Sequence, residues 1–109
     1  AYLAVLRDVG AIVAGSDAGS YGVPHGRGLI DELGFLRQAG LPLERVLASA
    51  TSLPRRLWGC APSDIQRGAR ADLVVLEGSP FESLANLHRV CRVLHGTKCH
   101  IPATVEPVR

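Results

Sequence analysis

The chain has 109 residues, of which 47% are hydrophobic and 20% are charged, so its composition is that of a globular protein and excludes a disordered chain. Twelve Lys and Arg against ten Asp and Glu leave a net charge of +2, which is too small to indicate nucleic-acid binding. No apolar run reaches the roughly 18 residues that cross a bilayer. We therefore expect neither a nucleic acid nor a membrane as a partner.

The first residues and the cysteines indicate whether the chain is part of a longer protein and which compartment it occupies. The chain begins with Ala-Tyr-Leu, contains no Met, and its first residues already have the pattern of the middle of a helix. We therefore expect a C-terminal segment of a longer protein. The three cysteines are an odd number, which argues against a disulfide framework and favours a reducing compartment, the cytoplasm.

The first part of the chain is predicted to alternate between helix and strand. Residues 1–9 carry apolar side chains along one stripe and predict a short helix that Gly10 ends. Residues 11–14 are entirely apolar and lie between glycines, which predicts a strand that is buried on both faces of a parallel sheet. A loop of small residues follows from Gly15 to Gly26.

Three more helices are predicted before residue 60. Apolar residues at helical spacing predict a helix over 28–39, which Gly40 ends. A proline then suits the first turn of a second helix over about 42–50. Ser52 is expected to cap a third helix that ends at residue 58.

The pattern changes to a small β-rich part after residue 60. Residues 73–76 predict a strand, and residues 81–87 predict a loop or one helical turn. Val90 to Ile101 read as a β-hairpin around a two-residue turn at His95-Gly96.

This predicted hairpin contains residue types that bind zinc. The cluster consists of His88, Cys91, His95, Cys99 and His100. The predicted turn places Cys91 opposite His100, and strand alternation then places Cys91 and Cys99 on opposite faces of the sheet. A shared zinc would need another loop length, so we expect these cysteines to be small buried residues rather than metal ligands.

Asp17 is the strongest candidate for a catalytic or ligand-binding residue. It lies at the C-terminal end of the predicted buried strand, where α/β folds place ligands and catalytic groups. Its small neighbours leave the carboxylate open to a metal or a substrate. The alternative is a turn or capping aspartate, which is common in such loops.

Two other features of the loop are weaker indications of a functional site. The glycines from 15 to 22 are not followed by the Gly-Lys-Ser/Thr that a phosphate-binding P-loop needs. His25, between Pro24 and Gly26, could bind a substrate or a metal or move a proton, and the alternative is a solvated loop histidine.

Taken in order, these pieces resemble the C-terminal end of the metal-dependent amidohydrolase superfamily, closest to its imidazolonepropionase-like and Xaa-Pro-dipeptidase-like branch. Each motif is weak alone, whereas their order and spacing over roughly residues 3–101 are fairly specific. The matching segments are VAGSDAG at 13–19, GVPHG at 22–26, ELGFLRQAGL at 32–41, VLASAT at 46–51, GARADLVVL at 68–76, Ser79-Pro80 and the hairpin at 90–99.

The resemblance implies an α/β fold. Members of the superfamily are (β/α)8 barrels with a small β-sandwich built from both chain ends. Residues 1–60 would be the C-terminal end of the barrel, with 11–15 as its eighth strand. Residues 61–109 would be C-terminal strands of the sandwich, in which Asp72 is structural.

The resemblance also implies a reaction, the hydrolysis of an amide, peptide or cyclic C–N bond in a small-molecule or peptide-like substrate. Asp17 matches the aspartate that binds a divalent metal, usually zinc, and acts as general base on the attacking water. A bound metal lowers the pKa of water, and a nearby carboxylate takes its proton and returns it to the leaving amine. His25 and Tyr21 would line the substrate pocket.

The chain departs from the superfamily in its metal ligands. The His-x-His pair, the carboxylate or carbamylated Lys and two further histidines of earlier strands are absent. A complete barrel needs roughly 250 residues. We therefore expect the isolated chain to be inactive and to pair with a missing N-terminal barrel portion or with itself. The alternative is a non-catalytic αβ binding or interaction module.

Overall fold

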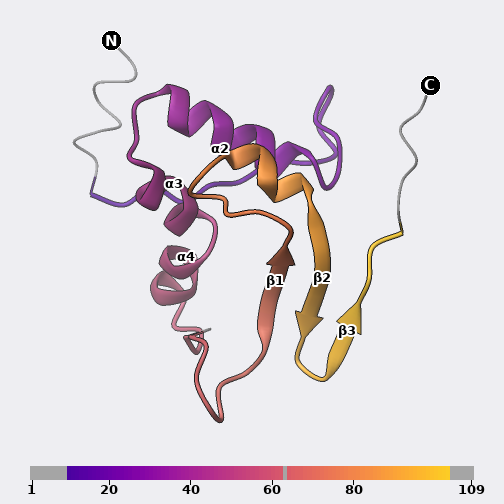
Figure 1. Ribbon diagram of the computed structural model, residues 1–109. Helices are drawn as coiled ribbons and strands as arrows, with labels where there is room; N and C mark the ends of the chain where they lie inside the picture. Colours follow the sequence, from indigo (N-terminus) through magenta and orange to yellow (C-terminus); the bar gives the residue numbers. More distant parts are fainter. Residues whose placement is uncertain (1–9, 63, 104–109) are drawn as a thin grey trace. The chain divides into compact units, whose positions relative to one another are not determined.

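The computed structural model describes residues 10–62 and 64–103 and divides into two compact units at Pro62/Ser63 (Figure 1). The described residues form a small α/β protein with three α-helices in unit 1 and one three-stranded antiparallel sheet in unit 2. The elements are α2 (Gly28–Gln38), α3 (Leu43–Ser49), α4 (Ser52–Leu57), β1 (Asp72–Leu76), the 3-10 helix η1 (Leu84–His88), β2 (Val90–His95) and β3 (Lys98–His100). The helix predicted over 1–9 lies outside the described residues.

Helix α2 confirms the helix predicted over 28–39. It ends in a Schellman motif, because the N–H of Gly40 donates to the carbonyl of Arg37 at 3.0 Å and the N–H of Leu41 donates to that of Leu36 at 3.2 Å. Gly40 has a φ of +95°, which a residue with a Cβ rarely adopts. The reversal buries Leu41, which is 1% exposed, below the last turn of the helix.

The next two helices also form, but the predicted cap of the last one is wrong. Pro42 directly precedes α3, as its position predicted. Ser52 is the first residue of α4, and Thr51 occupies the cap position without a capping bond. Only two residues separate α3 from α4, and the Thr51 hydroxyl donates to the carbonyl of Leu47 in the preceding helix at 2.8 Å. No helix in the described part of the chain has the length and apolar character to cross a membrane.

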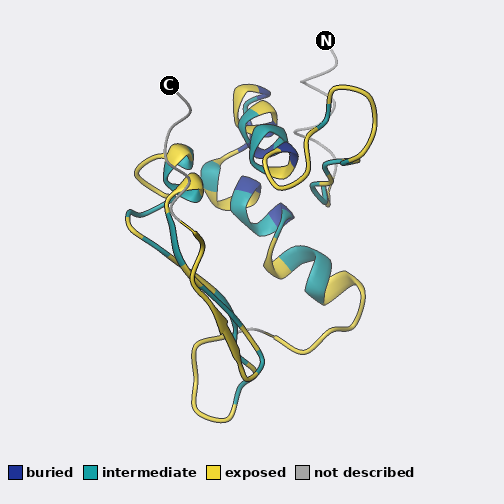
Figure 2. Cartoon of the chain, turned by 90° about the vertical axis from the view of Figure 1, so that its right-hand side faces the viewer, coloured by how far each residue is buried: buried dark blue, intermediate teal, exposed yellow. Residues whose placement is uncertain are grey.

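The core of unit 1 lies between α2 and α3, where Figure 2 shows the buried residues in dark blue. Ser49 is a fully buried polar residue, and its hydroxyl donates to the carbonyl of Val46 at 2.6 Å. The polar atom therefore keeps a partner in the apolar surroundings. The buried residues of this core are Leu33, Leu36, Ala39, Leu41, Val46 and Ser49.

The buried strand predicted over 11–14 is wrong for this structure. Residues 11–14 have no regular secondary structure, and Ile12, Val13 and Ala14 are half-buried. The N–H of Ala14 donates to the carbonyl of Ser49 at 3.0 Å, which attaches the segment to the end of α3. A parallel strand needs neighbouring strands for its hydrogen-bond ladder, and the described residues of unit 1 supply none.

Unit 2 confirms the predicted strand at 73–76 and the helical turn near 81–87. Strand β1 pairs antiparallel with β2, from Asp72 opposite His95 to Val75 opposite Arg92. A β-bulge follows, in which Cys91 is the extra residue of β2. The helical turn is η1.

The predicted hairpin forms with a different turn. The turn is at Gly96-Thr97, one residue later than predicted, so Cys99 lies opposite Leu94 and His100 lies opposite Val93. The predicted pairing of Cys91 with His100 is therefore wrong. Gly96 has a φ of +59° and takes the first turn position, while His95 stays in β2 opposite Asp72.

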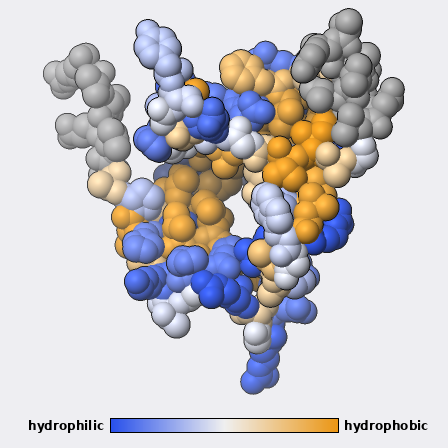
Figure 3. Space-filling model, turned by 180° about the vertical axis from the view of Figure 1, so that it is seen from behind, coloured by the Kyte–Doolittle hydropathy of each residue, from blue (hydrophilic) through white to orange (hydrophobic). Residues whose placement is uncertain are grey.

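The sheet exposes apolar side chains. No described residue of unit 2 is fully buried. Val74 and Val75 are successive residues of β1, with exposures of 56% and 43%, and strand alternation places them on opposite faces. Figure 3 shows apolar side chains gathered over the sheet on the face that it presents. Both faces of the sheet therefore leave apolar area in contact with solvent.

Candidate functional site

Asp17 lies in a tight turn with its carboxylate exposed. Its carbonyl accepts the N–H of Ser20 at 3.2 Å, and the Ser20 hydroxyl donates to Oδ2 of Asp17 at 2.7 Å. Its φ of +49° makes it the one non-glycine residue with a positive φ in the described ranges. Aspartate tolerates this region better than most residues. The turn role and the chemical role of Asp17 are compatible with this conformation.

The loop after Asp17 folds back and brings His25 against Gly19. The N–H of Gly19 donates to the carbonyl of Val23 at 3.2 Å, with Gly19 at a φ of +101°. A Cβ at Gly19 would lie 3.6 Å from Nε2 of His25, so the imidazole packs on the loop backbone. The structure thus places His25 in the same folded loop as Asp17. Tyr21 is fully exposed in that loop.

The loop also packs closely on the first turn of α2. Gly28 is buried, and its N–H donates to the carbonyl of Pro24 at 3.1 Å. A Cβ at Gly28 would lie 2.9 Å from Cγ1 of Val23 and 3.3 Å from Cβ of Ser16. Glycine at this position therefore allows the helix to hold the loop that carries Asp17.

We expect Gly28→Ala to destabilise unit 1, because the new methyl group would push Val23 and Ser16 out of place. Gly34→Ala is the matched control in the same helix, since a Cβ there meets nothing within 4 Å. Alanine at position 34 should stabilise the helix by about 1 kcal/mol, relative to glycine. Urea unfolding followed by circular dichroism measures both. Equal stabilisation by the two variants would contradict the close packing at Gly28.

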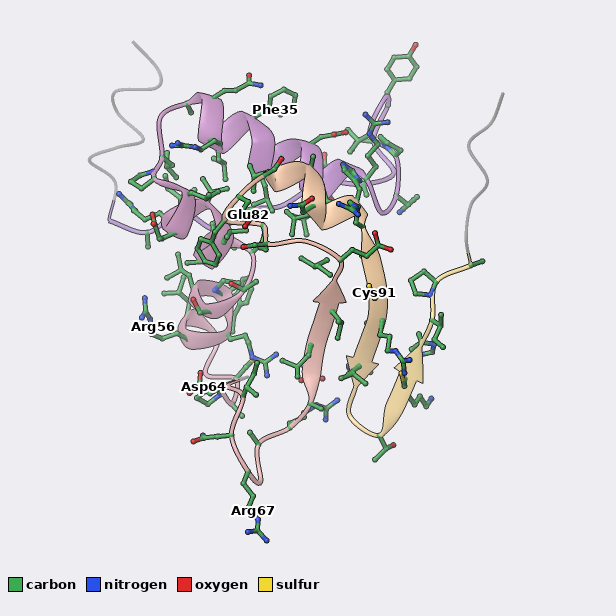
Figure 4. All side chains as sticks on the ribbon, viewed as in Figure 1. Phe35, Arg56, Asp64, Arg67, Glu82 and Cys91 are labelled. Atoms are coloured by element: carbon green, nitrogen blue, oxygen red, sulfur yellow. The ribbon has the colours of Figure 1, made fainter. Side chains whose placement is uncertain are left out.

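An open hollow of about 220 Å³ lies between this loop and α2. Ser16 and Val23 contribute from the loop, and Asp31, Glu32 and Phe35 contribute from the helix. Asp31 is paired with Arg27 at 3.4 Å, and both side chains are exposed. The side chain of Phe35 is exposed on α2 (Figure 4). The hollow therefore offers carboxylates and an aromatic edge beside the Asp17 loop.

The candidate metal ligands do not come together. Within residues 10–62 and 64–103, no group of three or more His, Cys, Asp and Glu side chains could hold a metal ion. The exposed Asp17 carboxylate fits one oxygen ligand of a divalent ion. The described residues alone therefore do not fit a complete metal site. All three cysteines are free thiols, with Cys60 and Cys99 exposed.

Unit 2 contains a polar cluster that the sequence patterns did not reveal. Asp72 Oδ1 lies 3.0 Å from Nδ1 of His95, and Nε of Arg70 donates to both carboxylate oxygens at 3.1 and 2.9 Å. The Asp72 side chain is 18% exposed. The signal was the register of β1 on β2, which places Asp72 directly opposite His95, the last residue of β2.

Comparison with protein-family models, curated proteins and solved structures gives no match to this chain. The resemblance to amidohydrolases therefore depends on the order and spacing of the sequence motifs.

Proposed function

We propose that the chain is the C-terminal part of a metal-dependent amidohydrolase, which hydrolyses amide, peptide or cyclic C–N bonds. The observation that best supports this proposal is the backbone of Asp17, which has a φ of +49° in the loop that follows the apolar segment 11–14. Uncommon backbone conformations of non-glycine residues gather at functional sites. The Ser20 hydroxyl bonds Oδ2 and so orients the carboxylate.

In this proposal, Asp17 carries the proton transfers. A divalent ion, usually zinc, would supply an activated water when the complete protein binds it. The Asp17 carboxylate would contribute one ligand oxygen, take the proton of the attacking water and pass it to the leaving amine. His25, folded against Gly19, and Tyr21, exposed in the same loop, would contact the substrate.

The same proposal assigns a place to each unit of the chain. Residues 1–60 would be the last part of a (β/α)8 barrel, and 61–109 would belong to a β-sandwich. The half-buried apolar segment 11–14 would become the eighth strand once neighbouring strands complete its ladder. The missing barrel portion would be the partner of this chain. A cytoplasmic location stays a prediction.

A non-catalytic interaction module is the second candidate, and the exposed apolar residues on both faces of the sheet favour it. Analytical sedimentation separates the two candidates. A compact monomer would favour a self-sufficient module, whereas self-association would favour a part that lacks its partner.

We expect the purified 109-residue chain to show no metal-dependent hydrolysis of amide or cyclic C–N substrates, because the other ligands are absent from its sequence. Assays with and without added zinc measure this. Turnover that zinc supports and that Asp17→Ala removes would contradict the expected inactivity of the isolated chain.

A further inference from the structure

We propose that one face of the β-hairpin in unit 2 binds the phosphate group of a small soluble phosphate ester. The binding groups are Arg70, His95, Lys98 and His100. The proposal is independent of the amidohydrolase proposal, since it uses only residues of unit 2.

The strand register brings the four groups to one face. His95 lies directly opposite Lys98, and Asp72 lies opposite His95 on the other side. Paired residues of antiparallel strands share a face, with Cβ atoms about 4.5–5.5 Å apart. His100 is two residues after Lys98 in β3 and therefore has the same orientation.

Asp72 fixes two of the four binding groups in advance. Its side chain is half-buried, and its carboxylate contacts Nδ1 of His95 and Nε of Arg70. Nη2 of Arg70 lies 3.6 Å from the place of a Cβ at Gly96, so the guanidinium extends along the hairpin turn. Holding donors in place lowers the ordering cost of binding.

The ring of His95 can offer an anion either an acceptor or a donor. When Nδ1–H donates to Asp72, a neutral ring presents the Nε2 lone pair, which repels an anion. A protonated ring donates from both nitrogens and attracts an anion.

The other groups on this face set the local charge. Arg70 and Lys98 each carry a positive charge on this face, and Asp72 carries a negative charge. Val74 and Val93 are the uncharged neighbours on the same face.

Other charged residues of the sheet lie outside the site. Arg92 is on the opposite face of β2, because it pairs with Val75. Arg89 is paired with Glu77 at 2.8 Å beyond the other end of the strands.

The size of the face favours a small ligand. Strand β3 has three residues, and the whole chain has a net charge of +2. A nucleic-acid surface needs a wider and more basic patch. Bidentate and charge-assisted bonds from Arg, Lys and protonated His suit the three oxygens of a phosphate group.

The test is a titration of the 109-residue chain with sulfate and with inorganic phosphate, followed by the NMR shifts of backbone amides at constant ionic strength. We expect shifts at Asp72 and from His95 to His100.

Two variants complete the test. Lys98→Gln should weaken sulfate binding about threefold, as expected for one exposed charge contact. Arg67→Gln removes the same charge from the loop before β1, where Figure 4 shows the side chain pointing away from the sheet, and should change binding less than twofold. Equal effects of the two variants, or shifts spread over the whole chain, would mean general ionic screening and would overturn the proposal.

Discussion

Replacing Leu41 by alanine is expected to lower the free energy of unfolding of unit 1 by about 2–5 kcal/mol. The Leu41 side chain is 1% exposed and follows Gly40 in the Schellman motif that ends α2. In that motif the residue after the glycine packs on the last turn of the helix. Truncation of the side chain would therefore leave a cavity and remove the apolar contact that stabilises the chain reversal at Gly40.

Urea unfolding followed by far-ultraviolet circular dichroism measures this change, because all three described α-helices belong to unit 1. Leu57→Ala is the control. Leu57 has the same chemistry in α4 but is 54% exposed, so we expect a change of at most about 1 kcal/mol. Similar losses in both variants would show that Leu41 is not part of a specific core.

In a longer protein that contains this chain and hydrolyses C–N bonds, Asp17→Asn is expected to lower kcat/KM about 10²- to 10⁴-fold. The amide has the shape of the carboxylate and can still accept the hydroxyl of Ser20, which donates to Asp17 at 2.7 Å. It cannot take a proton from water. The substitution therefore separates the chemistry of position 17 from its part in the turn.

Asp64→Asn is the control for this substitution, because Asp64 is exposed in unit 2 and its side chain loses the same charge. We expect full activity in that variant. A longer protein whose activity survives Asp17→Asn, with an unchanged circular dichroism spectrum, would show that Asp17 is only a turn residue.

Much of the helical part was predictable because its signals are local. The apolar spacing of α2, the glycine at 40 and the proline before α3 each act within a few residues of the chain. The cap of α4 was missed because the Thr51 hydroxyl bonds the preceding helix, a contact that depends on how closely the two helices follow each other.

The segment 11–14 and the hairpin turn were mispredicted for a different reason. A buried strand exists only where other strands pair with it, and the described residues of unit 1 contain no such partner. The turn was placed one residue early because the dipeptide His95-Gly96 fits a two-residue loop. The contact of His95 with Asp72, 23 residues away, holds His95 in the strand instead.

The candidate site was predictable only in part. The position of Asp17 in a small-residue loop followed from the sequence, and the structure adds its contact with Ser20. The cluster of Arg70, Asp72 and His95 depends on the strand register, which the incorrect turn concealed.

The coding sequence immediately upstream of Ala1 tests the central claim most directly. The account predicts that the reading frame continues upstream with a His-x-His motif, a carboxylate or lysine ligand and two further histidines, enough to complete a barrel of roughly 250 residues. A start codon directly before Ala1, or an upstream region without these ligands, would contradict it.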